Sequence, residues 1–156
     1  MHSKIFQVSK TPISKKDWIY ADMYLESFVG RVADYTDDID DAARKVWLEN
    51  LSRVPGLSVS NVSEQLMIVS KEEYFREYYK EFKEMIDKLS KVSLRDFCEA
   101  HQSFELNAFR LQSSISDEFG YYVDIDEGYP MPLQDYVRCC DDGDKLYIGG
   151  IVDYHY

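Results

Sequence analysis

Three residues of metal-binding types recur at helical spacing in the middle of the chain. His101 follows Cys98 by three residues and precedes Glu105 by four, so a helix would present all three on one face. Thiolate, imidazole and carboxylate are all zinc ligands, but zinc sites usually take a second pair of ligands from elsewhere in the chain. The other histidines, His2 and His155, are terminal and supply no such pair. We therefore expect a packed histidine bonded to Glu105, and no metal or other cofactor.

Alternating carboxylates further along the chain have part of a calcium-loop pattern. The segment reads Asp124-x-Asp126-x-Gly128, but a calcium loop needs glycine at its sixth position, where this chain has Tyr129. Prolines also interrupt the segment. We therefore interpret Asp124, Asp126 and Glu127 as part of an exposed acidic loop that binds no metal.

The familiar catalytic signatures are absent from the sequence. It contains no nucleophile elbow, no phosphate-binding loop, no dinucleotide fingerprint and no zinc-protease helix motif. Catalytic pairs are defined by spatial geometry, and spacing alone does not select one pair from 29 acidic residues. The sequence favours a protein that is not an enzyme, with an enzyme of unrecognised site as the remaining alternative.

Charge is distributed unevenly along the 156 residues. The chain has 18 Lys and Arg against 29 Asp and Glu, a net charge of −11. Residues 1–16 carry +4, residues 17–41 carry −7, residues 42–116 are neutral and residues 117–156 carry −8. This balance argues against direct binding of nucleic acid or of an anionic membrane, because both require a cationic face. An acidic surface of this kind either serves solubility or is kept for a basic partner.

Tyrosine is concentrated in the same acidic C-terminal segment. Seven of the thirteen tyrosines lie in residues 117–156. Tyrosine is enriched in protein interfaces, although β-strands also favour it. The predicted partner-binding residues therefore combine the acids of both flanks with two tyrosines of the last predicted strand: Asp34, Asp37, Asp38, Asp40, Asp41, Asp124, Asp126, Glu127, Asp141, Asp142, Asp144, Tyr147, Asp153 and Tyr154.

The sequence also predicts where the protein resides. Its first residues contain no apolar run of signal-peptide length, and no segment approaches the ~18 apolar residues of a spanning helix. The three cysteines, Cys98, Cys139 and Cys140, have no metal-type spacing, and adjacent cysteines rarely pair with each other. Free thiols indicate a reducing compartment, so we expect a cytoplasmic protein.

Periodicity predicts the elements that must position these residues. Residues 3–8 alternate as a strand, and residues 39–54 have helical spacing, with Asp37 or Asp38 as the N-cap and Pro55-Gly56 as the stop. Residues 57–69 are typical of a hairpin.

Two longer helices are predicted next. Ser70-x-x-Glu73 is a capping box that begins a helix with a continuous aromatic stripe as far as Leu89. A further helix over residues 93–115 has apolar residues on two sides, which is typical of a central element.

The remaining chain is predicted to be mainly strand. Residues 120–125 are a strand candidate, residues 132–138 a short helix, and residues 145–154 a long strand with Gly149-Gly150 as a bulge. The order of elements predicts one α+β domain over residues 1–156, with a mainly antiparallel sheet packed against two or three longer helices.

The function expected from these features is binding rather than chemistry. The first hypothesis is an acidic surface that docks on a basic protein partner, in particular a nucleic-acid-handling enzyme whose cationic groove it would occupy. In size and charge the chain resembles small acidic inhibitors of restriction or CRISPR enzymes, although no segment carries a family motif. The alternative is an adaptor or immunity-type protein that uses a tyrosine-rich sheet edge. A homodimer formed by pairing of the C-terminal strand is also open.

Overall fold

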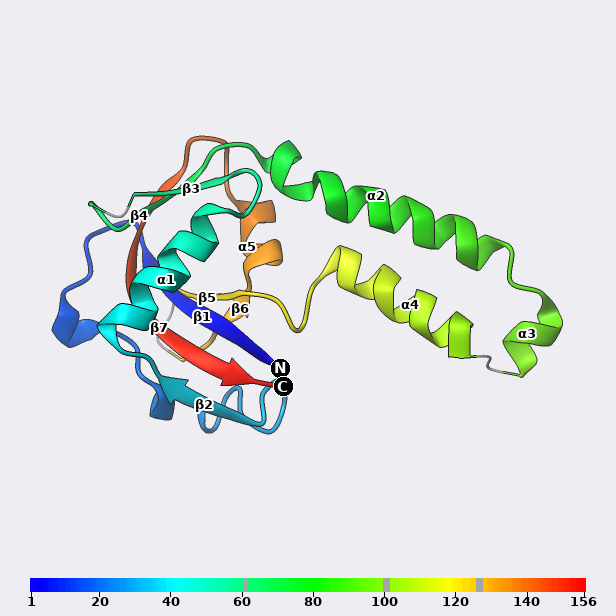
Figure 1. Ribbon diagram of the computed structural model, residues 1–156, viewed down its shortest axis with the longest axis horizontal. Helices are drawn as coiled ribbons and strands as arrows, with labels where there is room; N and C mark the ends of the chain where they lie inside the picture. The colour runs from blue at the N-terminus through cyan, green and yellow to red at the C-terminus, as the bar shows by residue number, and fades with distance from the viewer. Residues whose placement is uncertain (61, 100–101, 126–127) are drawn as a thin grey trace.

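A central strand organises the computed structural model, which describes residues 1–60, 62–99, 102–125 and 128–156. This strand is β7 (Lys145–His155), and β1 (His2–Ser9) pairs with it antiparallel along most of its length. The sheet has seven strands in the order β3-β4-β7-β1-β5-β6, with β2 also paired to β7 (Figure 1). The remaining strands are β2 (Tyr35–Asp38), β3 (Leu57–Ser60), β4 (Gln65–Ile68), β5 (Tyr122–Asp124) and β6 (Met131–Pro132).

Both edges of β7 are occupied by other strands. On the edge away from β1, β4 pairs with β7 at residues 145–147 and β2 pairs with it at residues 152–155. Among the described strands of the sheet, β1 with β5 is the one parallel pair and the others are antiparallel, so the predicted α+β class with a mainly antiparallel sheet is confirmed. A homodimer formed by pairing of the C-terminal strand, which the sequence leaves open, stays a prediction; within one copy, β1, β4 and β2 already pair with most of this strand.

A bulge interrupts the pairing of β1 with β7 where the sequence predicts one. Phe6 lies opposite Ile151 and Val8 lies opposite Ile148, so two glycines of β7 face one residue of β1. The amide of Gly150 donates to the side-chain oxygen of Gln7 at 2.9 Å. A Cβ on Gly150 would meet the backbone of Ile19, which explains why glycine is needed here.

The sheet is buried on both faces. Successive residues of β1 point in opposite directions, so Phe6 enters one core cluster and Ile5 enters the other. The first cluster lies under α1 (Asp41–Ser52) and α5 (Leu133–Cys139), and the second lies under the loops around the 3-10 helices η1 (Lys15–Asp17) and η2 (Ala21–Tyr24). Burial of both faces explains the almost continuous apolar run of β7.

The start of α1 differs from the prediction. Its N-cap is Asp40, whose Oδ1 accepts from the amide of Ala43 at 2.7 Å. Asp37 and Asp38, the predicted caps, lie instead in strand β2. Pairing with the end of β7 therefore extends this segment and delays the helix by two or three residues.

The other helices form an arm that projects from the rest of the molecule (Figure 1). The arm is residues 71–115, with α2 (Lys71–Ser90), α3 (Leu94–Cys98) and α4 (Gln102–Ile115); we call the remaining residues the body. Ser70 caps α2 as predicted, accepting from the amide of Glu73 at 3.2 Å. Residues 93–115 form two helices rather than one.

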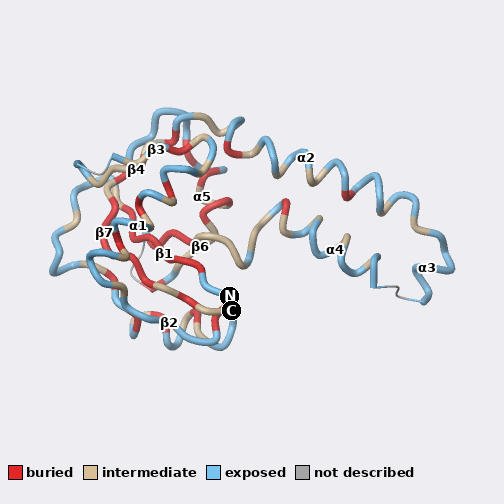
Figure 2. Tube along the Cα trace, viewed as in Figure 1, coloured by how far each residue is buried: buried red, intermediate tan, exposed pale blue. Residues whose placement is uncertain are grey.

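The arm has little buried surface of its own. Among its described residues only Tyr74, Met85 and Ser114 are buried (Figure 2). The prediction that the helix around residues 93–115 is a central element is therefore wrong. Its apolar stripe packs on α2, outside the body, rather than between the sheet and another layer. No helix in the described part of the chain is both long enough and apolar enough to cross a membrane.

Candidate protein-interaction surfaces

Strand β2 brings the two acid-rich flanks of the chain together at one border of the sheet. Asp37 lies directly opposite Asp153 of β7 in the antiparallel register. Asp34 is fixed just before the strand, where its amide donates to the carbonyl of His155 at 2.7 Å. Asp34, Asp37 and Asp38 are all exposed. The structure thus collects exposed carboxylates on the outermost strand of this border.

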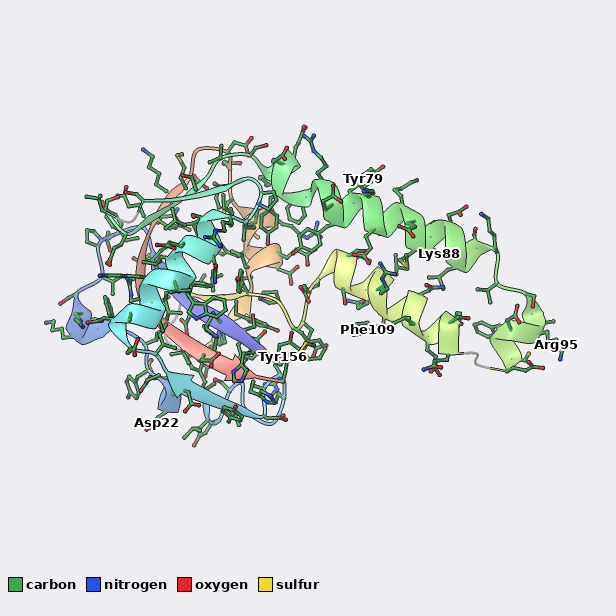
Figure 3. The ribbon with its side chains drawn as sticks, viewed as in Figure 1. Asp22, Tyr79, Lys88, Arg95, Phe109 and Tyr156 are labelled. Carbon is green, nitrogen blue, oxygen red and sulfur yellow. The ribbon has the colours of Figure 1, made fainter. Side chains whose placement is uncertain are left out.

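The same border continues into the neighbouring helices. Asp22 of η2 is exposed beside β2 (Figure 3), and Asp40 and Asp41 are exposed at the start of α1. We call this group the acidic edge: Asp22, Asp34, Asp37, Asp38, Asp40 and Asp41. Arg31 is the single base in residues 17–41, and Lys15 approaches Asp41 at 3.3 Å in an exposed pair of little energetic weight. The acidic edge therefore keeps most of its negative charge.

Two members of the acidic edge also hold the local backbone. The Oδ1 atom of Asp38 accepts from the amide of Ala21 at 2.7 Å, and Asp40 is the N-cap of α1. Carboxylates at such positions satisfy amides that the helix or turn leaves unpaired. Local structure thus accounts for two of these acids. Asp34 is exposed and approaches the Nδ1 atom of His155 at 3.3 Å, and Asp22, Asp37 and Asp41 are also exposed.

Asp153, predicted as a free surface acid, is instead neutralised. Lys4 and the Nδ1 atom of His2 (2.9 Å) both contact its carboxylate. The Lys4 side chain is only 3% exposed and its ammonium lies 3.9 Å from the ring centre of Trp47. A buried cation needs an opposite charge, so Asp153 serves the fold rather than a docking surface.

Asp124 is buried, which corrects its assignment to an exposed acidic loop. It is 1% exposed, and its Oδ2 accepts from the Tyr24 hydroxyl at 2.6 Å and from the Gly128 amide at 2.8 Å. Burial and the adjacent carboxylate raise the pKa of Tyr24 far above its ordinary range, so this hydroxyl remains a donor. Asp124 therefore joins β5 to the helix η2 from inside the core.

Tyr154 is also a core residue, and its assignment to a partner surface is wrong. It is fully buried, its hydroxyl donates to the carbonyl of Gly120 at 2.5 Å, and its ring packs against Phe28 at 5.1 Å. The error arises because β7 is central, with a buried residue on each face of the sheet. Tyr147 lies near the start of the same strand and is partly exposed.

The remaining predicted acids form a turn at the other end of β7. Asp141, Asp142 and Asp144 are exposed, and Asp142 accepts from the backbone amide of Lys71 at 2.8 Å. The nine-residue interval between Asp144 and Asp153 spans ~30 Å in a strand. Figure 1 shows the 141–144 turn and β2 at opposite borders of the body. The two acidic flanks therefore meet at β2 but do not form one continuous face.

Three residues named in the sequence analysis, His101, Asp126 and Glu127, lie outside the described residues. Cys98 and Glu105 are both exposed on the arm. Within the described ranges, no group of three or more metal-binding side chains is close enough to hold an ion. The three cysteines are all free thiols.

An apolar groove lies at the base of the arm. It has a volume of about 250 Å³ and is lined by Phe75, Tyr78, Tyr79, Phe82, Ile115 and Arg138. Along α2 the spacing Phe75, Tyr79, Phe82, Ile86 forms a second stripe beside the one that packs on α4. The sequence predicts one continuous aromatic stripe on this helix; adjacent aromatic pairs such as Tyr78-Tyr79 indicate that α2 has two apolar sides.

Charged residues occupy another face of the arm. Glu77, Lys80, Glu81, Glu84 and Arg110 surround a shallow depression. Arg110 of α4 reaches Glu81 of α2 at 2.7 Å, which ties the two helices together. The arm is therefore amphipathic as a unit, with one face charged and one face apolar.

A small cavity of about 200 Å³ lies where the arm joins the body. Tyr74, Tyr78, Asp117 and Gln134 line it, and the amide of Asp117 donates to the side-chain oxygen of Gln134 at 2.7 Å. Burial raises the pKa of the Asp117 carboxyl above its ordinary value. The carboxyl of Asp117 also accepts from the amide of Phe119 at 3.2 Å, so these side chains form a polar joint between the arm and the body.

A larger cavity of about 420 Å³ lies beside α1 and is built around a buried cation. Arg44 donates to Glu64 at 2.7 Å and to the carbonyl of Gly149 at 2.7 Å, and it stacks on Trp18 at 4.5 Å. These bonds attach α1 to the bulge of β7. The Arg44 guanidinium thus stabilises the fold by holding α1 against β7.

Comparison with known proteins gives no relative for this chain. No protein-family model matches it, and neither the curated proteins nor the solved structures contain a match.

Proposed function

We propose that this protein acts by binding, and that the acidic edge docks on a basic surface of a partner protein. The observation that carries the proposal is the position of Asp37 and Asp38 on the outermost strand beside β7, with Asp34 just before that strand, within a segment that contains a single base. Clustered charge of one sign steers a partner of opposite sign and raises the association rate. The protein itself would perform no chemistry.

The partner we propose is a protein that otherwise binds nucleic acid. An extended strand advances about 3.4 Å per residue, and successive phosphates of one DNA strand are also about 3.4 Å apart along the axis. Five of the six acids of the acidic edge lie within residues 34–41, and two of them, Asp37 and Asp38, are in the extended strand β2. Binding would then exclude nucleic acid from the partner's groove. We place this interaction in the cytoplasm, where the three free thiols would remain reduced.

Charge reversal on the acidic edge tests the proposal. We choose Asp34→Lys, Asp37→Lys and Asp41→Lys together, because these side chains hold no backbone amide. The immobilised protein is exposed to the heparin-binding fraction of a cell extract, and bound proteins are eluted with salt or with duplex DNA. We expect salt and DNA each to release a bound protein from the unmodified chain, and the triple variant to retain at least tenfold less of it.

The matched control is Glu72→Lys, Glu118→Lys and Asp141→Lys. All three are exposed acids away from the acidic edge, and their reversal changes the net charge by the same amount. This variant should keep most of the capture. Equal loss in both variants would show that total charge, rather than the acidic edge, is what binds. Capture that resists DNA would reject the nucleic-acid groove as the target.

A further inference from the structure

The arm exposes apolar side chains that the body does not cover. In the described part of the arm, five large hydrophobic residues that are exposed by 42% or more contribute to its apolar face, namely Tyr79, Ile86, Leu94, Phe97 and Ile115. Leu106 and Phe109 are also exposed, and their spacing of three residues places them together on another side of α4. Most helical stability in proteins comes from packing of an apolar face, and two isolated helices bury little. The arm therefore lacks a layer on its apolar face.

The arm and the body differ in net charge. Residues 71–115 contain eight bases and nine acids, whereas the rest of the chain contains ten bases and twenty acids. Two bodies of this charge repel each other, but two arms do not. A basic partner is attracted to the body rather than to the arm. The charge distribution thus favours a second copy of the chain as the occupant of the arm's apolar face.

We propose that the apolar face of the arm packs against the same face of a second copy, so that α2 and α4 of both copies form a four-helix bundle. The pairing is two-fold symmetric, with the two arms antiparallel. This arrangement sends the acidic bodies to opposite ends of the bundle. The 20 residues of α2 span about 30 Å, which exceeds the Debye length of about 8 Å at physiological salt.

The available area is sufficient for such a dimer. A hairpin of two helices is about 20 Å wide and here about 30 Å long, so each face covers about 600 Å². Two such faces bury about 1,200 Å² in total, within the range of specific interfaces.

The antiparallel arrangement gives the groove at the base of the arm an occupant. Ile86, which is 42% exposed, lies about midway along the arm between Tyr79 of the groove and Leu94 at the tip. If Ile86 lies near the two-fold axis, the tip of each arm reaches the groove of the other. Leu94 and Phe97 are 80% and 61% exposed at the tip, and they are the side chains that would enter it.

Sedimentation velocity over a wide range of protein concentration tests the dimer. The unmodified chain should change from one to two times 18.3 kDa as concentration rises. The double variant Tyr79→Lys and Ile86→Lys should remain monomeric, because two-fold symmetry places four lysines in the apolar contact. The control is Phe109→Lys, an aromatic on the outer edge of α4 (Figure 3) whose exposure of 53% lies between those of Ile86 and Tyr79, and this variant should dimerise as the unmodified chain does.

A cross-link tests the register independently of stability. In a chain carrying Cys98→Ser and Cys139→Ser, oxidation of Ile86→Cys should link two copies, whereas Phe109→Cys should not. Circular dichroism confirms that each variant remains helical. A monomer at every concentration overturns the proposal. A dimer that survives the Tyr79 and Ile86 substitutions, or that links through Phe109→Cys, also overturns it.

Discussion

Asp124 and Asp37 have identical side chains in opposite environments, and the difference comes from position in the sheet. Asp124 ends a buried strand and accepts hydrogen bonds from Tyr24 and Gly128. Asp37 lies in the outermost strand and is exposed. A count of acids therefore overstates the charge available to a partner, because Asp153 and Asp124 are both used inside the protein.

Asp117 is the acid whose titration should be visible in stability. It lines the cavity at the joint between arm and body, and burial raises its pKa above the ordinary value of 3.8. A raised carboxyl pKa means that the folded state binds the proton more tightly than the unfolded state. Its contribution therefore favours folding at low pH and declines as pH rises from 3.8 through the folded-state pKa.

We predict that Asp117→Asn is more stable than the unmodified chain at neutral pH. An asparagine oxygen can still accept the bond that Phe119 donates to Asp117, and the cost of burying an ionised group is removed. Urea unfolding from acid to neutral pH is the measurement. The advantage of the variant should be smallest in acid and should grow as pH rises. An advantage independent of pH would show that the carboxyl titrates normally.

Local signals in the sequence predict individual elements better than they predict which elements pack against one another. The capping box at Ser70, the hairpin at residues 57–69 and the bulge at Gly149-Gly150 are confirmed, because each depends on a few adjacent residues. Strand β2 was missed because its partner in β7 lies more than a hundred residues away. Its Asp-rich sequence has low strand propensity, and pairing with β7 overrides that propensity.

In the arm too, the sequence predicts the helices but not what they pack against. The aromatic stripe of α2 predicts a helix with an apolar side, but not what covers that side. The width of the stripe, with Tyr74 beside Phe75 and Tyr78 beside Tyr79, indicates two apolar sides. One side packs along α4, and the other lines the groove that Ile115 at the end of α4 and Arg138 of α5 complete.

Gly150 provides a test at the scale of the sheet. We predict that Gly150→Ala destabilises the protein by about 1–3 kcal/mol, because the added methyl group would overlap the backbone of Ile19 and force the bulge to move. The exposed strand residue Ser58 is the control, and Ser58→Ala should change stability by less than about 0.5 kcal/mol. Thermal unfolding compares the two. Similar stabilities would mean that the bulge accommodates a side chain.

The whole molecule combines one acidic surface with one apolar, nearly uncharged surface. The acidic edge belongs to a body with twice as many acids as bases, and the apolar face belongs to an arm that is almost neutral. In the proposed dimer the acidic edges would face away from the bundle, so one assembly would present two of them. Linked sites of this kind increase avidity when a partner can engage both.

Salt should therefore affect the two proposed interactions in opposite directions. We predict that higher ionic strength weakens capture of a basic partner, because it screens attraction to the acidic edge. Higher ionic strength should leave the dimer unchanged or strengthen it, because only repulsion between the bodies is screened. Sedimentation equilibrium and partner capture at the same salt concentrations measure both. A dimer that dissociates in parallel with partner release would show that charge, rather than the apolar face of the arm, joins the two copies.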